Sequence, residues 1–399
     1  MTFLVLMLGL VAWLIALPLC GGLIRWSRAL GLVDAGGGEG HKPTGRIVPD
    51  TGGVAVYLAV AGPMTVALLG VWLLPASAWA SMAPWATQHL EGLRGVTAVG
   101  GGLLVMLSAV HLMGLYDDRR PLGPWRKLGV QAAIAVGVVV LCETRVLRLM
   151  DDWGAWGVGL SVAVSVAWVL VIVNAMNFLD NMDGLCCGVA AVAGSVYLAA
   201  TLIAGQWFVA GLCALLVGAL LAVLVFNAPP AKVYLGDGGS LLVGLILAVV
   251  SMRTTYTVTP GAEVAGGGVI ASLTGGVGES AAVGAGGVGG VAGVETGWHV
   301  LLMPLMVLAV PLYDFVSVVV LRLLRGQSPM VGDHNHFSHR LVRRGLSRPA
   351  AVAVICLATL ATGLSGAMLT TLAPWQAWLA AGQTLAVLAV LAVLERGGT

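Results

Sequence analysis

The feature that most constrains this chain is a series of long apolar segments that recurs from one end to the other. A membrane-spanning helix needs roughly 18 or more consecutive apolar residues. Eleven segments approach or exceed that length: 2–24, 51–73, 96–115, 128–142, 157–173, 185–204, 208–226, 239–252, 299–321, 349–371 and 376–394. Only 10% of the residues are charged, against about 25% in soluble domains. The sequence therefore predicts an all-α integral membrane protein, a polytopic bundle of about eleven transmembrane helices.

The fourth and eighth segments are shorter than the others. We expect their helices to be tilted, broken or packed against neighbours.

The Lys and Arg residues predict the orientation of the bundle. If the N-terminus lies outside, 16 of the 20 Lys and Arg residues fall on the cytosolic side. Cytosolic loops of membrane proteins carry an excess of positive charge. We therefore expect an external N-terminus and a cytosolic C-terminus. The net charge of +2 says little about partners, because the basic residues are sorted by topology, and we expect no nucleic-acid partner.

One segment differs from the rest in composition. Residues 253–298 contain 14 glycines and few charges, and such a chain buries too little apolar surface to offset its ordering entropy. We predict a disordered external loop, inserted into a single transmembrane domain that spans 1–399 and whose core motifs lie within 42–346.

Polar clusters interrupt the apolar chain, and with this topology they all face the cytosol. They occupy 42–53, 117–127, 174–184, 232–240 and 328–348. Four of them contain closely spaced Asp or His residues, which bind Mg²⁺ and handle phosphate. A membrane enzyme with its active site on the cytosolic face is the first hypothesis.

Asp117 and Asp118 end the third segment, and Lys127 opens the fourth. Two adjacent carboxylates near lipid need a cation or a metal to neutralise them. Lys127 could reach one of them or a phosphate. The alternative is a solvated helix end followed by a proline turn.

The next cluster contains Asn177, Asp180 and Asp183. If the preceding helix continues, these side chains step by about 60° and share one polar stripe. No Lys or Arg lies in this loop, so an external cation, most simply Mg²⁺, is expected to compensate the acids. A structural polar network is the alternative.

In the fourth cluster, glycines flank Asp237, and Ser240 stands where a helix N-cap would aim free N–H groups at an anion. The last cluster contains His334, His336 and His339, followed by Arg340, which suit a phosphate-rich substrate. Asp314, an acid within the ninth apolar segment, is predicted to pair with a polar group of another helix or to border the site.

Four motifs, in this order, resemble the polyprenyl-phosphate N-acetylhexosamine-1-phosphate transferases, the superfamily that includes the MraY, WecA and TagO types. They are GLYDDRRPLGPWRK, NAMNFLDNMDGL, KVYLGDGGSLLVG and GDHNHFSHRL. The segment HKPTGRIVPDTGG is similar to the first cytosolic loop of the family. The histidine motif is closer to the WecA and TagO type, as are eleven helices. Ser338 departs from the usual adjacent histidine pair, and Asn181 stands where glycine is common.

The resemblance implies transfer of a sugar-1-phosphate from a UDP-sugar to undecaprenyl phosphate, with release of UMP, at the bacterial inner membrane. UDP-N-acetylglucosamine is the preferred donor, and UDP-MurNAc-pentapeptide is the alternative of the MraY type. The polymer would be a cell-envelope polysaccharide. The cofactor would be Mg²⁺, with Mn²⁺ as an alternative, and a homodimer stays open.

The resemblance also assigns roles to residues of this chain. Its catalytic residues would be Asp117, Asp118, Asp180, His336 and His339, and its metal ligand would be Asp237. The substrate-binding residues would be Lys42, Lys127, Asn177, Asp183 and Arg340.

Two other classes compete with this hypothesis. A secondary transporter would also have many helices, but its charges should lie near the bilayer midplane, whereas these lie in loops on one face. A CDP-alcohol phosphotransferase would need a compact motif of acids that the sequence does not contain.

Overall fold

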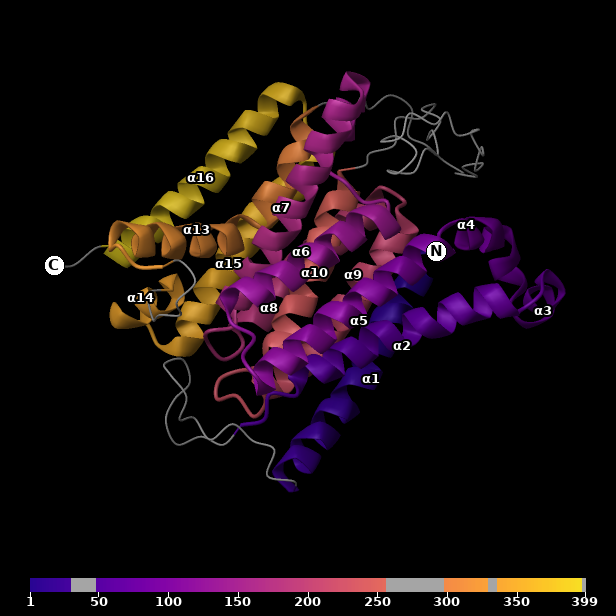
Figure 1. The fold of residues 1–399 in the computed structure, drawn as a ribbon, viewed down its shortest axis with the longest axis horizontal. Coiled ribbons are helices and arrows are strands. Elements are labelled where there is room, and N and C mark those ends of the chain that lie inside the picture. Colours follow the sequence, from indigo (N-terminus) through magenta and orange to yellow (C-terminus); the bar gives the residue numbers. More distant parts are fainter. Residues whose placement is uncertain (30–47, 256–297, 329–335, 397–399) are drawn as a thin grey trace.

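The computed structural model describes residues 1–29, 48–255, 298–328 and 336–396, and there every regular element is a helix. Figure 1 shows the long helices running side by side as a bundle. Ten have the bounds α1 Thr2–Ala29, α2 Gly52–Leu73, α5 Thr97–Arg119, α6 Pro124–Leu141, α7 Ala155–Leu179, α8 Leu185–Ile203, α9 Trp207–Asn227, α10 Asp237–Thr254, α15 Arg348–Ala367 and α16 Pro374–Arg396. The shorter elements are α3 Ala76–Met82, α4 Leu90–Gly95, α12 Met303–Val307, α13 Ala309–Leu324, α14 Phe337–Arg343 and the 3-10 turns η1 Pro84–His89, η2 Arg148–Trp153, η3 Trp298–Leu302 and η4 Met368–Thr370.

The helices confirm the predicted all-α membrane fold. Among the described residues, ten helices are long and apolar enough to cross a membrane, and a bent pair makes an eleventh span if it is counted as one. Each of the eleven predicted apolar segments coincides with one of these spans.

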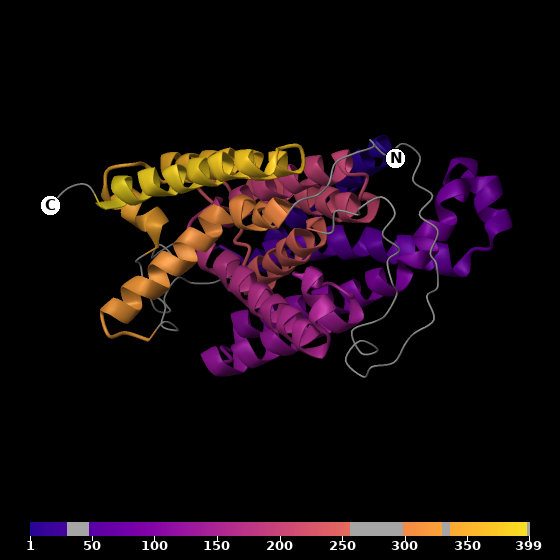
Figure 2. The same ribbon diagram turned by 90° about the horizontal axis from the view of Figure 1, so that it is seen from above.

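The ninth span, predicted at 299–321, is not one continuous helix. It is bent by 65° between Val300–Val307 and Ala309–Leu324. Pro311 lies in the first turn of α13, where it has no N–H to donate to the carbonyl of Val307, and its ring would clash with that carbonyl in a continuous helix. In Figure 2 the orange α13 runs out of the bundle at a steep angle to the yellow α16.

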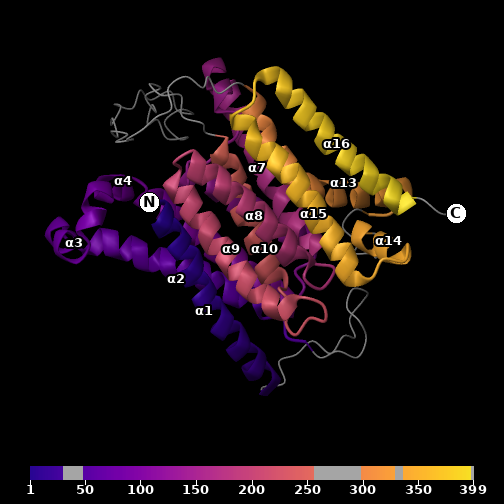
Figure 3. The same ribbon diagram turned by 180° about the vertical axis from the view of Figure 1, so that it is seen from behind.

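The helix α10 lies in the middle of the bundle, as Figures 1 and 3 show. It packs against α2, α5, α7, α8 and α9, and almost all of its residues are buried. A Cβ at Gly244 would lie only 2.7 Å from the Cα of Val173, so α10 and α7 approach closely, as small residues permit in membrane bundles. This confirms the expectation that the short eighth span packs against its neighbours.

Two predictions concern residues outside the described ranges. Lys42 and nearly all of the Gly-rich segment 253–298 belong to them.

The short helices α3 and α4, which the apolar pattern did not predict, lie far from α14 and α16 in Figure 1.

Candidate active site

The N-terminus of α10 meets the C-terminal turn of α5. The carboxylate of Asp118 accepts hydrogen bonds from the backbone N–H groups of Asp237, at 2.8 Å, and Gly238, at 3.1 Å. Gly236 is the N-cap of α10 and has a φ of +69°, which a glycine adopts without strain. A carboxylate at this position satisfies free N–H groups and complements the helix dipole. The expectation that Ser240 is the N-cap is therefore wrong.

One face of α5 holds this turn of α10 in place. His111, Gly114 and Asp118 are spaced three and four residues apart, so they share a helix face. His111 Nδ1 donates a hydrogen bond of 2.8 Å to the carbonyl of Gly238, and its ring stacks on Tyr57 of α2 at 4.4 Å. At Gly114 the backbones come so close that a Cβ would lie 2.5 Å from the Cα of Gly238.

Lys127, in the first turn of α6, joins two of the predicted acids. Its ammonium forms an ion pair of 2.8 Å with Asp117 and a second ion pair with Asp237. The other oxygen of Asp117 accepts the backbone N–H of Leu122 at 2.7 Å, which fixes the turn between α5 and α6. The prediction that Lys127 reaches these carboxylates is confirmed.

Asn177, in the last turn of α7, completes the cluster. Its Nδ2 donates to Asp237 Oδ1 at 2.8 Å and to the Ser240 hydroxyl at 2.9 Å. Four helices, α5, α6, α7 and α10, therefore bring Asp117, Asp118, Lys127, Asn177 and Asp237 together at one end of the bundle. The Asp237 side chain is 29% exposed, so it remains accessible from that end.

The first turn of α2 is tied to the same site. The N–H groups of Gly52 and Gly53 donate to the carbonyls of Tyr234 and Leu235, at 2.9 and 3.0 Å. The loop that leads into α10 is thus fixed by the end of the first polar cluster, as expected if the clusters meet at one face.

The polar stripe predicted after α7 does not form. The helix ends at Leu179, so Asp183 is not carried onto the face of Asn177. Instead, the buried Asp183 accepts the backbone N–H of Ala231 at 3.0 Å and braces the loop between α9 and α10. Asp180 is the C-cap residue of α7, three residues after Asn177.

The histidine motif begins a separate short helix, α14. His336 Nδ1 donates to Asp314 Oδ2 at 2.9 Å, and the other oxygen of Asp314 accepts the Phe337 N–H at 2.9 Å. Asp314 is fully buried, so the predicted partner on another element is found. The ring of Phe178, the residue after Asn177, meets the His336 ring edge-on at 5.5 Å. His339 follows in the first turn of α14.

Arg340 is held by a residue that the sequence did not single out. Its guanidinium pairs with Glu395 of α16 at 2.8 Å and donates to the Ser317 hydroxyl at 2.9 Å. The other oxygen of Glu395 accepts the Tyr313 hydroxyl at 2.7 Å, and its carbonyl accepts two bonds from Arg344. Glu395 is the only acid in residues 374–399, and this isolation is the signal that could have indicated a polar partner.

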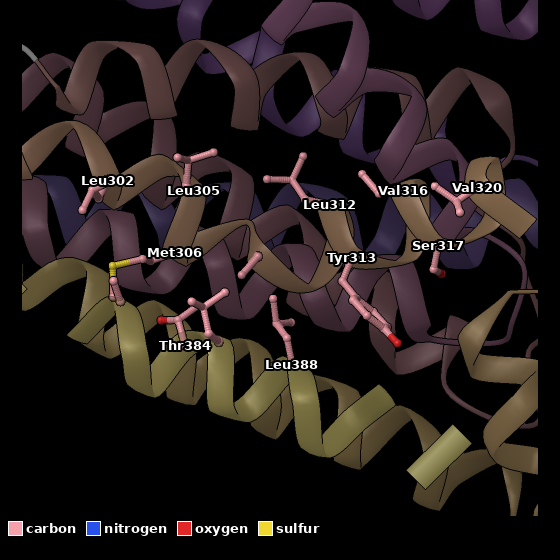
Figure 4. A pocket seen from close by; sticks show the side chains of 13 residues that line it. Leu302, Leu305, Met306, Leu312, Tyr313, Val316, Ser317, Val320, Thr384 and Leu388 are labelled. Carbon is pink, nitrogen blue, oxygen red and sulfur yellow. The ribbon is translucent and has the colours of Figure 1, made fainter. Parts of the chain in front are cut away.

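An apolar groove of about 560 Å³ runs beside this ion pair, between the bent ninth span and α16 (Figure 4). Tyr313 and Ser317 line it and also contact Glu395 and Arg340. The remaining lining residues are Leu302, Leu305, Met306, Ala309, Leu312, Val316, Val320, Ala381, Thr384, Leu385 and Leu388.

The donors at the cluster fit a magnesium ion that arrives with phosphate oxygens. Within the described ranges, no three His, Cys, Asp or Glu side chains gather as a metal-binding group. Mg²⁺ is commonly bound by one or two carboxylates together with substrate phosphates and waters. Asp237 offers an accessible carboxylate, with Asp117 joined to it through Lys127.

Comparison with known proteins agrees with this site. The model of glycosyl transferase family 4 matches residues 101–255, which include the whole cluster around Asp237. A probable undecaprenyl-phosphate N-acetylglucosaminyl 1-phosphate transferase of Bacillus subtilis is 24% identical over 70% of this chain and 67% of its own length. A decaprenyl-phosphate N-acetylglucosaminephosphotransferase of Mycolicibacterium smegmatis is 28% identical over 77% of this chain and 68% of its own length.

The chain is similar to the family that its motifs predict. A phospho-N-acetylmuramoyl-pentapeptide-transferase of Limosilactobacillus fermentum is 34% identical over 38% of this chain. The chain spans about half the length of that relative, since the match covers 50% of it. The similarity to the two N-acetylglucosamine enzymes extends further along the chain, and the similarity to the muramoyl-pentapeptide enzyme is higher but more local.

Proposed function

We propose that this protein transfers N-acetylglucosamine-1-phosphate from a UDP-sugar to a polyprenyl phosphate, releasing UMP and starting synthesis of a cell-envelope polysaccharide. The observation that carries the proposal is the convergence of Asp117, Lys127, Asn177 and Asp237 at the end of a membrane bundle. The names of the two relatives that match along 70% and 77% of the chain support this donor and this acceptor class.

The residues of the cluster have separable roles in this reaction. An oxygen of the lipid phosphate attacks the sugar-proximal phosphorus in line, and the bond to the bridging oxygen breaks, so that UMP leaves with that oxygen. Lys127 lies between two carboxylates, where it can exchange one of them for a phosphate oxygen and neutralise charge on it. Asn177 holds the carboxylate of Asp237 in one orientation.

The paired aspartates differ in what they bind. Both oxygens of Asp118 accept N–H groups of α10, so we assign Asp118 to holding the turn that carries Asp237. Asp117 faces Lys127, and we assign it to orienting the attacking phosphate and receiving its last proton. We place His336 and Arg340 at the phosphate-binding side of the same site, with Asp180 and His339 beside them.

We further propose that the reaction requires Mg²⁺, with Mn²⁺ as a substitute, held by Asp237 and the pyrophosphate. When bound, the ion would neutralise charge on the pyrophosphate and on the leaving UMP. The active site would face the cytosol of a bacterium, in the inner membrane, as the distribution of Lys and Arg indicates. Lys42 would contact the substrate from the first cytosolic loop, and a homodimer is the proposed assembly.

A muramoyl-pentapeptide transferase is the second candidate, because the local identity to that relative reaches 34%. A transporter is disfavoured, because Asp117, Asp118 and Asp237 lie at helix ends rather than in mid-span.

The test is UMP release by purified protein in detergent, given undecaprenyl phosphate, Mg²⁺ and either UDP-N-acetylglucosamine or the muramoyl-pentapeptide nucleotide. Asp237→Asn should abolish release, whereas Asp152→Asn, the same change at an exposed residue of η2, should retain it. Release with only the pentapeptide nucleotide would favour the second candidate. Folded protein that releases no UMP from either donor would contradict the proposal.

A further inference from the structure

A buried hydrogen bond joins the loop after α7 to the histidine helix. Ser338 Oγ lies 2.6 Å from Asn181 Oδ1, and the two residues are 157 positions apart in the chain. Asn181 Nδ2 donates to the carbonyl of Phe178 at 2.6 Å. A carbonyl only accepts, so this contact fixes the orientation of the amide, and Ser338 must be the donor to Oδ1.

Ser338 is fully buried and Asn181 is 8% exposed, so they share one closed space. A small hydroxyl and a longer amide fill this space together.

The pair also connects to the ring of His336. Asn181 anchors the backbone of Phe178, and the ring of Phe178 meets His336 edge-on at 5.5 Å. Asp314 fixes the same imidazole from α13 through Nδ1. The histidine is thus located by two contacts, one of which depends on the Asn181–Ser338 bond.

We propose that Asn181 and Ser338 are a matched pair of positioning residues that docks α14 onto the end of α7 and so places His336 for the transfer reaction. The inference rests on the proposed function. Because the two side chains share one hydrogen bond in a buried space, the effects of replacing them are expected not to add.

The test is a double-mutant cycle with Ser338→His, Asn181→Gly and the combination of both. Each single change should lower kcat about tenfold or more, because it crowds the space or leaves a buried polar atom unpaired. The combination should cost no more than the larger single change, because both single changes break the same hydrogen bond and the two together conserve the volume. KM for the UDP-sugar should change little, and Ser338→Thr, which keeps the hydroxyl, should retain more activity than Ser338→Ala.

The control is Ser251→Ala, which removes a hydrogen bond of 2.9 Å from Trp168 near the other end of α10. It should lower the thermal midpoint without lowering kcat. The four proteins of the cycle are also compared by thermal midpoint, which needs no activity. Additive effects in both kcat and midpoint would overturn the inference. Coupled midpoints in a protein that releases no UMP would support the docking pair and contradict the proposed function instead.

Discussion

The contact between Gly114 of α5 and the first turn of α10 predicts a sharp loss of activity on Gly114→Ala. The added Cβ would lie 2.5 Å from the N and Cα of Gly238 and 2.6 Å from the C of Asp237. All three are backbone atoms, so no side chain can rotate away. Ordinary contacts of a Cβ are 3.4–4 Å, so the turn carrying Asp237 must move by about 1 Å, a displacement that can cost about 100-fold in rate.

The expected result is a kcat for UMP release about 10- to 100-fold below wild type, with a stability loss of about 1–3 kcal/mol from overpacking. The matched control is Gly101→Ala in the same helix, where a Cβ would meet nothing within 4 Å. That variant should keep its kcat and gain helix stability of up to about 1 kcal/mol. A folded Gly114→Ala protein with wild-type kcat would refute the claim that this close approach positions Asp237.

Four further outcomes follow from the contacts of the site and its surroundings. Asp118→Ala should lower the free energy of unfolding by about 0.5–2 kcal/mol, the cost of a lost helix cap, measured by thermal or denaturant unfolding. Asp151→Ala should cost about 1–3 kcal/mol without changing kcat, because it removes the carboxylate that pairs with the buried guanidinium of Arg145, which keeps its bond to Ser161. We expect the apolar groove of Figure 4 to hold the polyprenyl chain of the acceptor, so Ala381→Trp, which fills it, should raise KM for a long-chain polyprenyl phosphate roughly tenfold but leave KM for a short-chain acceptor unchanged. Chelation with EDTA should abolish UMP release, and added Mg²⁺ should restore it; release that persists in EDTA would contradict the assignment of Asp237 as metal ligand.

Much of the fold was predictable because a helix that crosses a membrane requires a long apolar segment in the sequence. Apolar length alone located all eleven spans, since the backbone of each span must satisfy its own hydrogen bonds in lipid. The central place of α10 was partly foreseeable, because a span too short to stand alone in lipid is accommodated by neighbours. The break before Pro311 could have been predicted from the sequence, because a proline has no N–H to donate to a carbonyl of the preceding turn.

The composition of the site was more predictable than its hydrogen bonds. The sequence located Asp117, Asp118, Lys127 and Asp237 near one another, but partners depend on where helices end. One turn lost at Leu179 sends Asp183 to a loop instead of the cluster.

Contacts between distant positions escaped the sequence entirely. Nothing local to Asn181 or Ser338 indicates that they meet, because a hydrogen bond across 157 residues is set by packing of whole helices. The face of His111, Gly114 and Asp118 was not predicted either, although its spacing of three and four residues is that of one helix face.

The ion pair of Glu395 has a consequence for the order in which the site forms during synthesis. Glu395 lies in the last turn of α16 and binds Arg340 and Arg344 of the histidine helix segment. Domains and helices that leave the ribosome early can pack before later ones exist, so the Asp237 cluster, which lies within α5 to α10, can assemble first. The histidine helix gains its last anchor only when α16 has been inserted. A chain that lacks α16 would therefore contain the assembled acidic cluster but a loosely held histidine helix. Transferase activity would then appear only after α16 has been inserted.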